Sequence, residues 1–113
     1  MKMKIRYIKY IPFGKQDIVI YPYIFWLSGF TPTIKLRRHA YIHIEQQEEC
    51  LWIFFFLIYA VEFLIKFLFK WNIEKAYRNI SFEREAYTNQ ADKNYLKNRK
   101  KFAWIKYIYE GKK

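Results

Sequence analysis

The chain has 113 residues, of which 53% are hydrophobic and 23% aromatic, and its formal net charge is +11 at pH 7. This apolar content excludes an intrinsically disordered chain, and the length predicts one domain spanning residues 1–113. Cys50 is the single cysteine, which excludes an internal disulfide and a four-thiolate metal site. No continuous apolar stretch follows the basic start. We therefore expect no signal peptide, and a cytoplasmic or membrane-associated protein that does not depend on disulfides.

The order of predicted elements indicates an α+β fold. Alternating residues in 2–10 and β-branched and aromatic residues in 17–25 predict a small β-hairpin within residues 1–27. Residues 34–71 contain neither glycine nor proline. We therefore expect residues 32–71 to hold two helices, broken near 48–50. Further helices are predicted at 81–90 and 92–110. We expect the hairpin to pack on a bundle of three to four helices.

The two histidines of the chain, His39 and His43, lie four residues apart in a segment that we expect to be helical. Both imidazoles then occupy one face of the helix. This is the spacing of the zinc-binding half of the motif H-E-x-x-H. Ala40 occupies the second position of that motif, where a glutamate would stand.

The similarity extends beyond the histidines. The pattern His39-x-x-x-His43-x-x-Gln-Gln, the aromatic-rich segment after it, and residues 76–87 together resemble small gluzincin-like zinc metallopeptidases of bacteria and their phages. The resemblance covers residues 20–107. It implies a minimal zincin-like fold in which His39, His43 and Glu83 hold zinc. It also implies that Ala40 replaces the general base that activates water and later protonates the leaving amine, a role that a methyl group cannot perform.

Several neighbouring residues are candidates to support such a site. Gln46 and Gln47 follow the histidines and are candidates to orient them through hydrogen bonds, or are ordinary exposed residues of the helix. Glu85 is the alternative to Glu83 as the acidic residue. Tyr87 lies one turn after Glu83 and is either a stabiliser of an oxyanion or a packed aromatic ring.

Other readings of the histidine pair remain open. The two histidines are alternatively ordinary side chains paired with Glu45, Glu48 or Glu49. Ala40 itself has two explanations, a natural pseudoenzyme or a deliberate Glu→Ala change. The intact pattern around position 40 favours the deliberate change. In either case we expect a zinc-binding, metallopeptidase-like scaffold that is disabled at Ala40 and takes a peptide or protein substrate. Residues 17–25 are the candidate edge strand for binding an extended peptide.

The alternative function rests on the apolar segment 51–69 and the basic C-terminal tail. Only Glu62 and Lys66 interrupt the apolar run, which is long enough to span a bilayer. It is equally typical of a core helix, a surface that meets a partner subunit or forms a homo-oligomer, or a helix on a membrane surface. No nucleic-acid-binding motif is present, so we do not expect a nucleic-acid partner. The alternative is therefore a non-enzymatic membrane-associated or structural binding protein.

Overall fold

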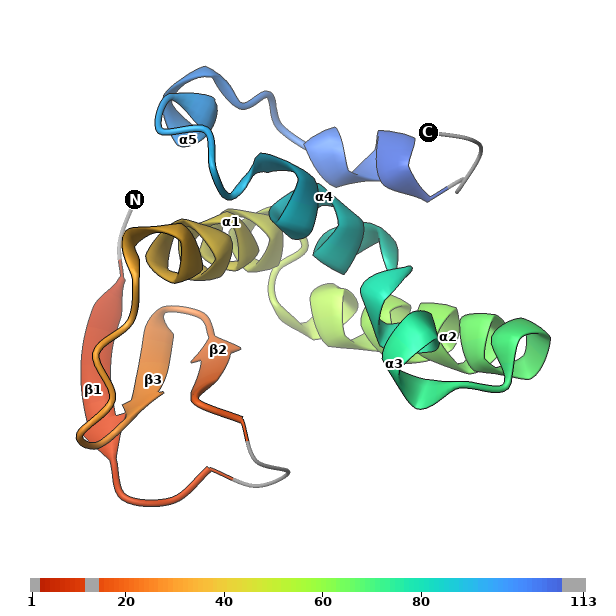
Figure 1. Cartoon of the computed structure of the whole chain (residues 1–113). Coiled ribbons are helices and arrows are strands. Elements are labelled where there is room, and N and C mark those ends of the chain that lie inside the picture. Colours follow the sequence, from red (N-terminus) through yellow and green to blue (C-terminus); the bar gives the residue numbers. More distant parts are fainter. Residues whose placement is uncertain (1–2, 12–14, 109–113) are drawn as a thin grey trace.

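The structure is a computed structural model that describes residues 3–11 and 15–108, and its fold is α+β. A small sheet lies on one side of the first helix and the C-terminal part of the chain on the other, while the second helix extends away beyond the end of the first (Figure 1). The strands are β1 (Lys4–Ile8), β2 (Asp17–Ile20) and β3 (Tyr23–Leu27). The helices are α1 (Ile34–Glu49), α2 (Ile53–Lys70), α3 (Ile73–Arg78), α4 (Ser81–Asn89), α5 (Tyr95–Asn98) and the 3₁₀ helix η2 (Ala103–Tyr107).

The sheet has the strand order β1-β3-β2, with β2 antiparallel and β1 parallel to β3. A small sheet forms in this region as predicted, but its pairing differs from the prediction: the predicted single strand 17–25 is two strands, β2 and β3, which form a hairpin with each other. The first strand, expected to be the other arm of the hairpin, pairs parallel to β3 instead. The turn falls at Tyr21–Pro22, because proline has no N–H to donate to a sheet and its φ angle is fixed. This arrangement leaves β2 at the edge of the sheet, where it packs against α1.

The helical region follows the prediction closely as far as residue 89. Thr33 caps α1, since its hydroxyl accepts a hydrogen bond from the Leu36 N–H. The predicted break separates α1 from α2, whose axes differ by 111°. Leu51 and Trp52 adopt positive φ at this bend. The short helix α3 lies in a stretch for which no helix is predicted from the sequence.

The predicted helix 92–110 is wrong as a continuous element. Within the described residues only α5 and η2 are helical there, and residues 109–110 lie outside the described part of the chain. Arg99 has extended backbone, and its guanidinium forms ion pairs with the buried carboxylates of Glu49 and Glu85. This buried contact takes the chain out of the helix at Arg99, and helical structure resumes as η2 directly after Phe102, whose φ is 60°.

Two apolar clusters pack around α1, one against its side and one at its C-terminal end. One joins the sheet to α1 through Ile24, Trp26, Ala40 and Ile44. The other joins α2, α4 and η2 through Cys50, Phe55, Ile80, Phe82 and Trp104. Burial raises the pKa of Cys50 to about 11, so this thiol stays protonated and acts as a small apolar residue.

Among the described helices, none is by itself long and apolar enough to cross a membrane. The bent pair α1 and α2 passes that test of length and composition only when the two helices are taken together.

Candidate metal centre

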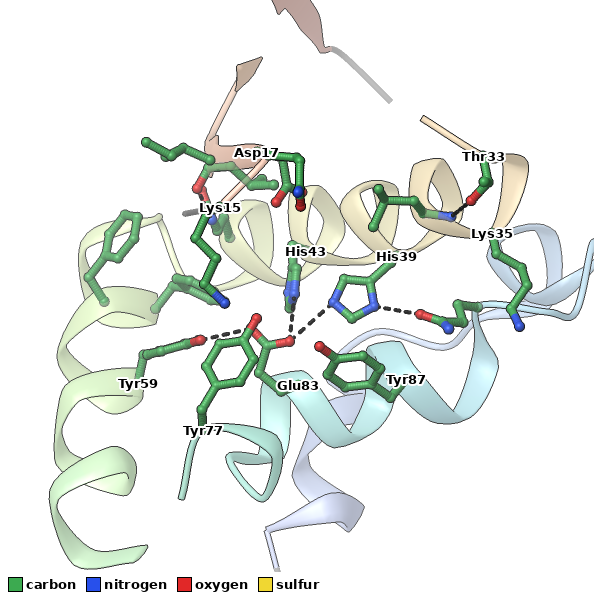
Figure 2. A pocket seen from close by; sticks show the side chains of 18 of the residues that line it. Lys15, Asp17, Thr33, Lys35, His39, His43, Tyr59, Tyr77, Glu83 and Tyr87 are labelled. Carbon is green, nitrogen blue, oxygen red and sulfur yellow. Dashed lines mark hydrogen bonds and ion pairs between the residues drawn. The ribbon is translucent and has the colours of Figure 1, made fainter. Parts of the chain in front are cut away.

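Two helices bring three potential metal ligands together in a buried space. His39 and His43 project from α1, and Glu83 projects from the first turn of α4 (Figure 2). The Glu83 Oε1 atom lies 3.1 Å from His39 Nε2 and 3.3 Å from His43 Nε2. One potential ligand atom from each residue lies within 4.8 Å of the others, and all three side chains are buried. This group could hold a metal ion.

The outer ring nitrogens are held by amide oxygens. His39 Nδ1 lies 2.7 Å from Gln90 Oε1, and His43 Nδ1 lies 2.7 Å from Gln46 Oε1. An amide oxygen only accepts hydrogen bonds, so each Nδ1 carries the proton and donates it. In a neutral ring with the proton on Nδ1, the Nε2 atom keeps its lone pair. The Nε2 lone pairs of both histidines then point to the same place beside Glu83, as binding of a metal ion at Nε2 requires.

A buried chain of hydrogen bonds fixes the orientation of Gln46. Its Nε2 donates to the Phe82 carbonyl at 3.0 Å and to Glu85 Oε1 at 2.9 Å, which leaves its oxygen for His43. Glu85 is fully buried and also binds the Arg99 guanidinium. Glu85 therefore lies behind the histidines and supports the site through Gln46, whereas the carboxylate that reaches both imidazoles is that of Glu83.

The neighbouring Gln47 does something different. It is also buried, but it accepts from the Tyr21 N–H and donates to the Val19 carbonyl. These bonds tie the edge strand β2 to α1, next to the pocket. The structure thus separates two glutamines whose roles the sequence leaves open: Gln46 holds a histidine, and Gln47 positions a strand.

Their mutual charge interaction decides the direction in which the pKa values of Glu83 and His43 shift. Burial alone would raise the pKa of Glu83, but the charges and hydrogen bonds of His43 and His39 outweigh it and hold the pKa well below its usual range. Burial alone would lower the pKa of His43, but the charge and hydrogen bond of Glu83 raise it above its ordinary value. Without a metal, the Glu83 carboxylate and the His43 imidazole therefore each favour the charged form of the other.

Tyrosines and one aspartate complete the walls of the pocket, whose volume is about 770 Å³. The Tyr59 hydroxyl donates to Glu83 Oε2 at 2.7 Å, and the Tyr87 ring packs edge-on against His39 with ring centroids 4.5 Å apart. Asp17 of β2 lies above His43 in Figure 2. Burial raises the pKa of Asp17 despite the opposing charges of His43 and His39.

Ala40 lies beside this pocket but faces the sheet. Its methyl group is fully buried and packs in the cluster with Ile24, Trp26 and Ile44. Ala40 is not among the residues that line the pocket in the described chain. The position that the family resemblance assigns to a general base therefore carries no group able to move a proton.

Sequence reasoning missed four residues that line the pocket, Asp17, Tyr59, Tyr77 and Gln90. Gln90 lies seven residues after Glu83, so two helical turns place both on one face, and this spacing is a signal that was available. Tyr59 and Tyr77 gave no such signal, because aromatic residues are frequent throughout this chain. The alternative histidine partners Glu45, Glu48 and Glu49 form none of the histidine contacts recorded for the described residues.

In comparisons with known proteins, no protein-family model, curated protein or solved structure matches the chain. The resemblance to gluzincin-like peptidases therefore stays a prediction.

The two glutamines offer a matched test of the hydrogen bonds behind the site. We expect Gln46→Met to lower zinc affinity about 10–100-fold, because His43 loses the acceptor that fixes its tautomer. Gln47→Met should leave zinc affinity within about twofold and instead lower the free energy of unfolding by about 1–3 kcal/mol, because β2 loses its bonds to α1. Competition with a coloured chelator and urea denaturation measure the two effects. Equal losses of zinc affinity in both variants would contradict the assignment.

Zinc should stabilise the chain more strongly as pH rises. The raised pKa of His43 contributes stability to the metal-free chain below pH about 6.5, and this contribution is lost as pH rises through that pKa. Zinc must displace the same proton, so zinc affinity should fall up to about tenfold per pH unit below the pKa of His43. Thermal unfolding with and without zinc at pH 5.5, 6.5 and 7.5 measures this. A zinc-induced rise in melting temperature that is independent of pH would show that His43 is not a ligand.

Proposed function

We propose that the chain is a zinc-binding, metallopeptidase-like scaffold that is catalytically disabled at Ala40. One observation carries the proposal: two buried Nε2 atoms and a Glu83 oxygen converge while amide oxygens occupy both Nδ1 atoms. Without a ligand, this arrangement lowers the stability of the fold, because the buried carboxylate loses its hydration. A divalent cation at the point of convergence offsets that cost more fully than one shared proton does.

The donor set favours zinc over other common metals. Two imidazole nitrogens and one carboxylate oxygen match zinc, whereas calcium and magnesium prefer oxygen ligands throughout. Three protein ligands also leave a fourth position open, which is typical of catalytic rather than structural zinc sites. When bound at such a site, zinc supplies Lewis-acid polarisation of a carbonyl group and lowers the pKa of water. His39, His43 and Glu83 are the residues that would hold it.

The edge strand β2 supports a peptide as the ligand of this pocket. The Gln16 carbonyl accepts from the Leu27 N–H of β3, and the Val19 carbonyl binds Gln47 on the opposite side. Because backbone groups of successive residues face opposite edges of a strand, the N–H and C=O of Asp17 face the same side as the Val19 carbonyl. Gln47 already binds the Val19 carbonyl, so the N–H and C=O of Asp17 are the groups of this edge that can pair with an extended peptide beside the metal site.

The loss of the general base explains why we propose a disabled scaffold. Acid–base catalysis by a positioned side chain typically contributes about 10²–10⁴-fold to rate. Ala40 has no such group, while the residues that bind the metal and the peptide are all present. Tyr87 remains available to donate a hydrogen bond toward the pocket, where its ring already contacts His39. Binding of zinc and peptide is thus retained without efficient turnover.

Restoring a carboxylate at position 40 tests this proposal. Position 40 lies beside the pocket but is buried against the sheet, so a glutamate there must displace its packing with Ile24 and Trp26 to reach the metal site. For an Ala40→Glu variant that folds, we expect peptidase activity that a chelator abolishes, by a factor of about 10² or more over the unchanged chain. Ala40→Gln is the matched control, because it adds a side chain of the same size at the same buried position without a base. Cleavage of a fluorogenic peptide library, with zinc content measured on the same samples, gives the comparison.

Two results would contradict the proposal. One is an Ala40→Glu variant that folds and binds zinc but cleaves no more than Ala40→Gln. The other is chelator-sensitive cleavage by the unchanged chain, in which case Asp17 is the pocket carboxylate to replace next.

A further inference from the structure

The second helix presents an unusual surface. Every exposed residue of α2 is apolar, although the helix is 18 residues long. Its three charged residues, Glu62, Lys66 and Lys70, all lie on the half-buried side. This is the reverse of a helix on the surface of a water-soluble domain, where the polar face points outward. The exposed residues are Ile53, Phe54, Phe56, Leu57, Ala60, Val61, Leu64, Ile65, Leu68 and Phe69.

The inward charges have specific partners. The Glu62 carboxylate accepts from the Ser81 N–H at 2.8 Å and from the Ser81 hydroxyl at 2.6 Å, at the start of α4. Lys66 Nζ donates to the Asn79 carbonyl at 2.8 Å. These contacts fix the rotation of α2 about its own axis, because turning the helix would break them. The apolar side is therefore held outward by the fold itself.

The ends of the helix and the charge of the chain indicate what covers this side. Trp52 and Trp71 bracket α2 and are 50% and 74% exposed. Tryptophan is enriched where a membrane meets water. The formal net charge of +11 complements anionic lipid headgroups, and the exposed Lys75 lies in α3, which packs against α2.

We propose that α2 lies in the surface of an anionic lipid bilayer, with its exposed apolar side among the acyl chains and its axis along the membrane plane. A helix of this length is about 27 Å long, and the inward stripe of charges stays on the protein side. The exposed apolar positions cover more than half of the helix. A two-helix contact uses about two positions in seven, so a second copy of the chain would leave much of this surface in water, whereas lipid covers all of it.

Vesicle flotation with the full chain tests the proposal. We expect the protein to float with vesicles of phosphatidylcholine and phosphatidylserine, and about tenfold less with phosphatidylcholine alone, because the charge contribution is lost. Leu57→Glu combined with Leu64→Glu should lower binding to the anionic vesicles at least about tenfold, since both exposed side chains would enter the acyl region. Ser28→Glu combined with Asn98→Glu is the control, with the same charge change at exposed positions outside α2.

Circular dichroism of each variant checks that the fold is retained. Quenching of tryptophan fluorescence by brominated lipid, compared between the chain and its Trp52→Phe and Trp71→Phe variants, reports insertion at each end of α2. Equal loss of binding in the two double variants would overturn the proposal, because the attraction would then be electrostatic alone. So would a dimer in lipid-free solution that dissociates when Leu57 and Leu64 are replaced and that does not float. These results are independent of zinc content, so they do not depend on the metal centre.

Discussion

The contact of one Glu83 oxygen with two histidine Nε2 atoms is the constraint on which the arrangement of this chain depends. It places a carboxylate in a space where its hydration is lost, so the surrounding structure must supply positive charge and hydrogen bonds. His43 supplies a charge, and Tyr59 donates to the second oxygen. Helix α4 must therefore lie against α1 at this point, and α2 must bring Tyr59 alongside.

The helix α1 serves two sides of the molecule at once. On one side Ala40 and Ile44 pack against the sheet, and on the other the histidines face α4. Gln47, on the same helix, binds the backbone of β2 and holds this strand against α1 beside the pocket. The edge strand and the two histidines therefore share one support, α1. This shared support is the physical basis for our proposal that a peptide binds between them.

Sequence patterns predict the parts of this fold that depend on local spacing. The pairing of His39 with His43 follows from helical periodicity, and the break between α1 and α2 lies close to its predicted place. The tail was predicted wrongly, because Arg99 leaves the helical path for two carboxylates distant in sequence. A similar limit applies to Tyr59, which reaches Glu83 only because α2 bends back after residue 50. Contacts of this kind depend on tertiary packing, and the periodicity of a local segment carries no information about them.

The metal content of the purified protein tests the central claim most directly. The chain would be purified without added metal and analysed by elemental mass spectrometry against protein concentration from amino-acid analysis. The convergence of His39, His43 and Glu83 predicts about one zinc per chain. Zinc-free protein that also takes up none after incubation with the ion would contradict the account, because the three side chains would then form only a buried ion pair.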